Sequence, residues 1–265
     1  MSLSRKKISP TSAMHFFKLC FRSTLFFAAL ILYIINRVRR TGEHFGGYED
    51  KPLFLLFLWA VFVVEMILRF FPAKVESMGC QKQFARNYRP AQTERSGATT
   101  SPASVIAVAV AWIALNASIG VTYFLGWIDK GILLLIALAY SVCDMICILF
   151  FCPFQTWFMK NKCCTTCRIY NWDYAMMFTP LVFLQNIFAW SLLGLALALL
   201  IQWEIQAHRH PERFSENTNA CLDCGACKEK LCSHKRQLRQ FLRKNKDRLA
   251  LTGNRLLRRE NNKKE

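Results

Sequence analysis

Apolar residues occur along this chain in long blocks, separated by short polar segments rich in Lys and Arg. A helix that crosses a bilayer needs about 20 mostly apolar residues. Five blocks approach or exceed that length: residues 16–36, 53–71, 104–127, 131–151 and 174–203. Backbone groups in lipid must hydrogen-bond internally, so we expect every block to be helical. Five such blocks are rare in a soluble fold, and the sequence predicts an all-α, polytopic helical membrane protein.

The first block begins like a signal peptide, with Arg5, Lys6 and Lys7 ahead of the apolar run. It lacks a small-residue cleavage site and ends in the basic stretch 37–40, which indicates a retained anchor helix. Its uninterrupted apolar core, residues 25–35, is short. A helix that lies in the membrane interface is therefore the alternative.

The topology is judged from the positions of Lys and Arg, because these residues favour the cytoplasmic side of a membrane. The outcome depends on whether the last block crosses the membrane once or turns back. If residues 174–203 dip in and return, 29 Lys and Arg lie inside and 5 outside; if the first block instead lies on the inner surface, the counts are 26 and 8. We favour the first arrangement. Pro180 and the pair Gln185 and Asn186 are expected to split the block into a re-entrant hairpin with arms of about 15 residues. This predicts a multi-pass plasma-membrane protein with a cytoplasmic C-terminal tail.

The composition agrees with a chain in which apolar residues and basic residues occupy separate segments. Of 265 residues, 53% are hydrophobic, and 35 Lys and Arg against 17 Asp and Glu give a net charge of +18. The 22 Phe residues exclude a disordered chain. Twelve cysteines are too sparse for a small disulfide-stapled secreted domain.

Four cysteines and a histidine cluster near the C-terminus with the spacing C-x2-C-x2-C-x4-C: Cys221, Cys224, Cys227, Cys232 and His234. Two-residue gaps let neighbouring thiolates converge on one soft metal ion or cluster. The run 221–227 resembles the cluster-binding run of bacterial-type ferredoxins, and Gly225 permits the tight wrap. The resemblance implies a 4Fe–4S iron–sulfur cluster. The fourth cysteine follows at a different gap, and Ser233 stands in place of proline.

The same residues also suit zinc. Cys221 and Cys224 form one ligand pair, and Cys227, Cys232 or His234 can complete a tetrahedron. The sequence leaves iron–sulfur and zinc open as cofactors.

A second group of thiols lies between the fourth and fifth blocks: Cys152, Cys163, Cys164 and Cys167. Cys164 and Cys167 have the spacing of a ligand pair, and Cys152 is placed to close the site across a ten-residue gap. A disulfide is the alternative if this loop faces an oxidising compartment. The two groups serve two metal centres or one shared site only if both lie on the same side of the membrane. Cys143 and Cys147 share a face of the fourth block and are interpreted as packing residues.

Three charged residues lie inside apolar blocks. Glu65 and Arg69 are four positions apart in the second block, and Asp144 is in the middle of the fourth. Each such charge costs about 2.5–3.5 kcal/mol on insertion scales. We expect Glu65 to pair with Arg69 on one helix face. A proton or ion path that includes Asp144 is the functional alternative.

Two polar segments complete the chain. Residues 72–103 have the composition of a flexible linker. Residues 234–262 predict a basic amphipathic helix whose partner is the lipid bilayer, in particular anionic lipid. This segment carries no recognised nucleic-acid motif, so no specific nucleic-acid partner is expected.

These observations predict a helical membrane domain over residues 1–205 and a Cys-rich module with a basic helix over residues 206–265. Hydrolase and phosphate-binding motifs are absent from the sequence, and we assign no catalytic residue. The leading hypothesis is an iron–sulfur electron carrier or redox subunit with a redox protein partner. A zinc-stabilised membrane scaffold and a small transporter that uses Glu65, Arg69 and Asp144 are the alternatives.

Overall fold

The computed structural model describes residues 10–39, 52–71, 82–91, 102–159, 167–215 and 217–222. Over these residues the chain is helical apart from turns and an isolated β-bridge. Five of the helices are long and apolar enough to cross a membrane: α1 (Pro10–Arg39), α2 (Pro52–Phe70), α4 (Pro102–Phe124), α5 (Lys130–Leu149) and α7 (Ile187–Arg209). The prediction of an all-α fold with five helices suited to span a membrane is confirmed for the described residues.

Shorter elements connect and cap the long helices. They are η1 (Ala85–Asn87), the π-helical turn η2 (Phe154–Phe158), η4 (Tyr170–Trp172), α6 (Asp173–Phe178), η5 (Thr179–Phe183), η6 (Pro211–Arg213) and η7 (Ala220–Leu222). The run η4–α6–η5 crosses the bundle as a broken helix that packs against both α5 and α7.

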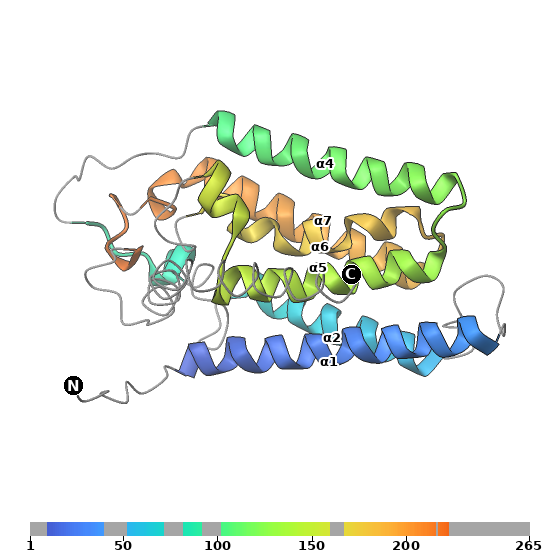
Figure 1. Ribbon diagram of the computed structural model, residues 1–265. Helices are drawn as coiled ribbons and strands as arrows, with labels where there is room; N and C mark the ends of the chain where they lie inside the picture. The colour runs from blue at the N-terminus through green and yellow to red at the C-terminus, as the bar shows by residue number, and fades with distance from the viewer. Residues whose placement is uncertain are drawn as a thin grey trace, which may run out of the picture.

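The long helices lie side by side in one bundle, with α1 and α2 on one side, α4 on the other, and α5, α6 and α7 between them (Figure 1). Successive segments run in opposite directions, so α1 begins and α7 ends at the same end. We call this the loop-rich end, formed by residues 82–91, 151–159, 167–172 and 210–222. The opposite turn end is formed by residues 125–129 and 184–186.

A break at the turn end divides the last apolar block. Leu184 takes an extended conformation (φ −93°, ψ 116°), and the Asn186 side chain accepts a 2.8 Å hydrogen bond from the Phe188 amide at the start of α7. The side chain of Asn186 thus satisfies an amide that the helix leaves unpaired. The structure shows the predicted break and reversal of the chain, but the expected length of the second arm is wrong, and this arm is long and apolar enough to cross a membrane. This arm, α7, has 23 residues because the helix continues through polar positions to Arg209.

The first helix packs within the bundle. Arg22, Leu25 and Ala29 on one face of α1 are buried, and the helix packs mainly against α5. This packing along α5 favours a membrane-crossing helix over one that lies flat on the membrane surface.

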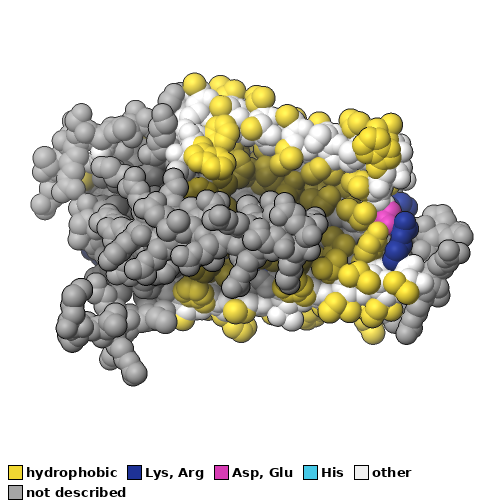
Figure 2. Space-filling view, viewed as in Figure 1, with side chains coloured by type: hydrophobic (Ala, Val, Ile, Leu, Met, Phe, Trp, Pro, Cys, Tyr) yellow, Lys and Arg dark blue, Asp and Glu magenta, His cyan; other side chains and the backbone are white. Residues whose placement is uncertain are grey.

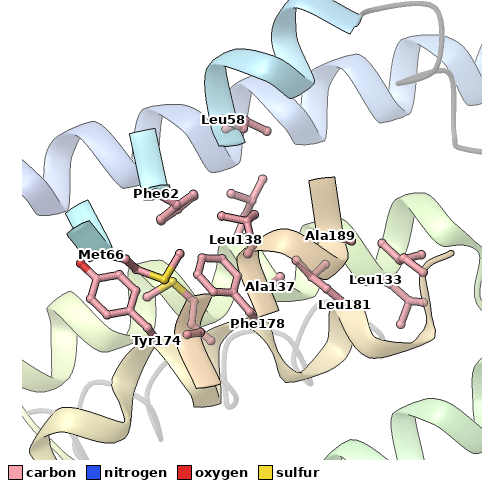
Figure 3. Close-up of a cluster of buried hydrophobic side chains, with 14 of the residues drawn as sticks. Leu58, Phe62, Met66, Leu133, Ala137, Leu138, Tyr174, Phe178, Leu181 and Ala189 are labelled. Atoms are coloured by element: carbon pink, nitrogen blue, oxygen red, sulfur yellow. The ribbon is translucent and has the colours of Figure 1, made fainter. Parts of the chain in front are cut away.

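The core is built around the broken arm. Phe62 and Met66 of α2 meet Tyr174 and Phe178 of α6, with Leu138 of α5 beside them (Figure 3). The rings of Phe62 and Phe178 meet edge to face, 5.2 Å apart. Burial of these side chains places α6 between the two halves of the bundle.

Residues 82–91 pack against residues 213–222 at the loop-rich end. Asn219 is fully buried and donates to the carbonyls of Lys82 (3.0 Å) and Arg213 (2.9 Å). The Ala220 amide donates to the Arg89 carbonyl (2.8 Å). The prediction of a flexible linker over 72–103 is thus wrong for residues 82–91, because Asn219 and this backbone pairing fix their position.

Candidate functional site

A cluster of charged side chains lies between the helices near the loop-rich end. We call it the polar cluster and define it by Lys18, Arg22, Glu65, Arg69, Asp144, Asp173 and Tyr174. Its members come from α1, α2, α5 and α6, so the cluster joins four segments that are distant in the sequence.

Arg22 is the centre of the polar cluster, and only 2% of its side chain is exposed. Its guanidinium donates to Glu65 Oε2 (2.6 Å), to Asp144 Oδ2 (3.1 Å) and to the Ser141 carbonyl (3.1 Å). Charge-assisted hydrogen bonds of this kind are among the strong ones in proteins. Arg22 therefore connects α1 to both α2 and α5.

Glu65 and Arg69 have different partners, although they lie four residues apart. Glu65 also lies 3.7 Å from Lys18 Nζ and accepts a 3.2 Å hydrogen bond from the Tyr174 hydroxyl. Arg69 instead donates to Asp173 at the start of α6. The expected pair within α2 is thus replaced by pairs between elements. These pairs join buried groups that face each other across helix interfaces.

The polar cluster is balanced in formal charge. Lys18, Arg22 and Arg69 are matched by three carboxylates, those of Glu65, Asp144 and Asp173. Buried charges are tolerated when they are paired and hydrogen-bonded.

Sequence reasoning identified Glu65, Arg69 and Asp144 but missed Arg22 and Asp173 as their partners. Arg22 follows closely on the basic residues that open the chain, and Asp173 directly precedes the last apolar block. Arg22 falls inside the long apolar stretch of the first block. Glu65 and Asp144 are carboxylates inside two other apolar blocks, and each needs a cationic partner at membrane depth. Arg22 could have been recognised as that partner from its position alone.

A cavity of about 250 Å³ lies beside the polar cluster, between α4, α5, η2 and α6. Its walls include Trp112, Tyr140, Phe154 and Met176, and Asp144 and Asp173 border it. The ring of Trp112 lies 4.8 Å from that of Tyr140. In the space-filling view, the surface below α4 is recessed and almost wholly apolar (Figure 2).

Four thiols line this cavity: Cys143, Cys147, Cys152 and Cys167. The Gln155 amide donates to Cys152 Sγ (3.4 Å). The structure therefore brings two predicted ligands, Cys152 and Cys167, to one cavity. It adds to them two cysteines that the sequence pattern assigned to packing. Within the described ranges, however, no group of three or more His, Cys, Asp or Glu side chains is arranged to hold a metal ion.

Cys221 is the member of the C-terminal group that falls within the described residues. Its Sγ donates to the Asn87 carbonyl (3.1 Å), and its amide donates to Asn219 Oδ1 (3.0 Å). Six further predicted ligands lie outside the described residues: Cys163, Cys164, Cys224, Cys227, Cys232 and His234. A metal at Cys221 would require donors from that part of the chain.

No protein-family model, no curated protein and no solved structure matches this chain.

Proposed function

We propose that this chain is an integral membrane metal-binding protein that serves as an iron–sulfur electron carrier or redox subunit. Cys221, Cys224 and Cys227, with Cys232 or a cysteine of the 152–167 group, hold the cluster at the loop-rich end. The bound cluster supplies one-electron transfer, and the chain's own residues position it beside the membrane.

The observation that carries this proposal is that the described members of both cysteine groups lie at the same end of the bundle. The Cys221 amide is held by Asn219, whose side chain donates to the Lys82 carbonyl. The next residue, Gln83, accepts a 2.9 Å hydrogen bond from Asn171, four residues after Cys167. This same-side placement is what a shared or paired metal centre requires.

The distribution of charge supports a reducing environment for these thiols. Segments that lie at, or continue from, the loop-rich end contain 27 of the 35 Lys and Arg residues, with Lys18, Arg22 and Arg69 of the polar cluster left out. Basic segments favour the cytoplasmic face, where thiols stay reduced. We therefore place the loop-rich end in the cytoplasm and the basic tail against anionic lipid of the plasma membrane.

Metal analysis of the full-length protein tests the proposal. The protein is purified without oxygen in detergent, and iron, acid-labile sulfide and zinc are measured together with the visible spectrum. We expect iron and sulfide, and a broad band that bleaches on reduction. Zinc without a visible band would instead indicate the scaffold function, and absence of both metals would refute metal binding.

Single substitutions locate the site. Cys221→Ser is expected to lower the iron content and the visible band, because a hydroxyl is a poor ligand for this cluster. Cys20→Ser is the matched control, since Cys20 is an exposed thiol on α1 and belongs to neither group. Equal loss of iron in both variants would argue against a site at Cys221.

A further inference from the structure

We propose that the cavity between α4, α5, η2 and α6 binds the ring of a neutral, lipid-soluble quinone. The inference rests on the cavity and the polar cluster alone, and it holds whether or not the chain carries a metal.

The size and walls of the cavity fit one flat aromatic ring system. Its volume of about 250 Å³ is near the lower limit of ordinary small-molecule pockets, which hold about 300–1,000 Å³. Trp112, Tyr140 and Phe154 provide aromatic surfaces, and the Trp112 and Phe154 rings are 6.2 Å apart, edge to face. Offset stacking and edge-to-face contacts favour a flat ring.

The charge of the surroundings selects a neutral ligand. The two carboxylates that border the cavity already have cations, since Asp144 accepts from Arg22 and Asp173 accepts from Arg69. The polar cluster as a whole is balanced. A cationic or anionic ligand would therefore add an unpaired charge to a poorly hydrated site, which is costly.

Two of the residues that line the cavity carry polar groups that suit the oxygens of a quinone or quinol. Among the described residues, the structure records no hydrogen-bond partner for the Tyr140 hydroxyl, and this hydroxyl can donate to a quinone carbonyl. Asp144 uses Oδ2 toward Arg22, and no partner is recorded for its Oδ1 within the described ranges. That oxygen can accept from a quinol hydroxyl.

The cavity is reached from the lipid side of the bundle. Cys143 lines the cavity and is exposed, although it lies within the membrane-crossing helix α5. On α4, Ile106, Val110 and Ile113 present apolar side chains to the surroundings. A ligand dissolved in the bilayer can therefore enter sideways without passing through water.

Titration of the full-length protein in dodecyl maltoside with decylubiquinone tests the proposal, with tryptophan fluorescence as the readout. We expect saturable quenching, because Trp112 lines the cavity. Cys143→Phe places a ring at the cavity mouth and is expected to weaken binding at least about tenfold. Cys20→Phe makes the same change on an exposed position of α1 outside the cavity, and should leave affinity unchanged.

A milder substitution keeps the test valid if the larger ring disturbs folding. Tyr140→Phe removes one hydrogen-bond donor and should weaken binding about threefold to tenfold. Tyr123→Phe on α4 is its control, since Tyr123 lies against Phe183, away from the cavity. Quenching that does not saturate, or equal affinity in all four variants, would overturn the proposal. Metal content measured on the same samples reports on the proposed function separately.

Discussion

Ion pairs inside the bundle differ from those at its two ends in burial and in the number of partners. Arg22 is 2% exposed and reaches two carboxylates and a carbonyl. At the turn end, Arg37 is 76% exposed and lies 3.9 Å from Asp129. At the loop-rich end, Arg168 and Glu204 meet at 2.5 Å with 27% and 37% exposed.

This difference in burial determines what each pair contributes. Water screens an exposed pair and solvates either partner when the other is removed. A buried partner has no such substitute, and its charge remains in an apolar environment. The charges of the polar cluster are therefore satisfied only when all four segments are packed together. The pairs at the two ends contribute less to stability.

The largest effect is expected for Arg22→Met, which leaves Glu65 and Asp144 buried without their common partner. We expect a loss of about 3–5 kcal/mol in the free energy of unfolding. Thermal unfolding in detergent, followed by size-exclusion chromatography, measures it. Arg37→Met is the control and should change stability by less than about 1 kcal/mol. Equal losses of stability in the two variants would show that burial does not determine how much each ion pair contributes.

Removing the buried charges together should cost less than removing one. The triple variant Arg22→Met, Glu65→Gln, Asp144→Asn has no unpaired charge among these three positions, so it should be more stable than Arg22→Met alone. The same unfolding assay compares the two. A triple variant that is less stable than the single one would mean that the charges act independently.

An intermediate effect is expected for Asn219→Ala at the loop-rich end. The substitution removes two hydrogen bonds from Asn219 to partly buried backbone carbonyls and should cost about 1–3 kcal/mol of local stability. Hydrogen exchange should then rise in residues 82–91, while the amides of α5 stay protected. Unchanged exchange in residues 82–91 would show that the backbone pairing with 218–220 is sufficient.

The smallest effect is expected for Arg168→Gln. Both partners of the Arg168–Glu204 pair are partly exposed, and the Trp172 indole still donates to Glu204 (2.6 Å) in the variant. We expect a change of about 0.2–1 kcal/mol in the free energy of unfolding, which 0.5 M salt should reduce further. A loss near that of Arg22→Met would contradict the comparison.

The helical membrane fold could be predicted because its signal is local. Long apolar blocks indicate spans, and Pro180 with Asn186 marks the break in the last one. The length of α7 could not be predicted from hydropathy alone, since its final turns are polar and Glu204 depends on Arg168, 36 residues away.

The polar cluster and the cavity depend on tertiary contacts. Four-residue spacing favours a Glu65–Arg69 pair on an isolated helix, but in the bundle Arg22 and Asp173 reach these residues from other segments. Cys143 and Cys147 carry no motif, and only the packing of α4, η2 and α6 against α5 brings them beside Cys152 and Cys167. Metal binding by the two cysteine groups, which was inferred from their spacing, remains a prediction.

The break at Leu184–Asn186 determines whether the chain crosses the bundle an even or an odd number of times. Were residues 174–203 one continuous helix, the chain would cross the bundle an odd number of times. With the loop-rich end in the cytoplasm, as proposed above, the 16 Lys and Arg residues from position 204 onward would then have to pass through the bilayer during insertion. Because the broken arm returns the chain before α7 begins, α7 ends where α1 starts. In the proposed orientation, one asparagine cap and an extended leucine thus spare the basic tail from translocation.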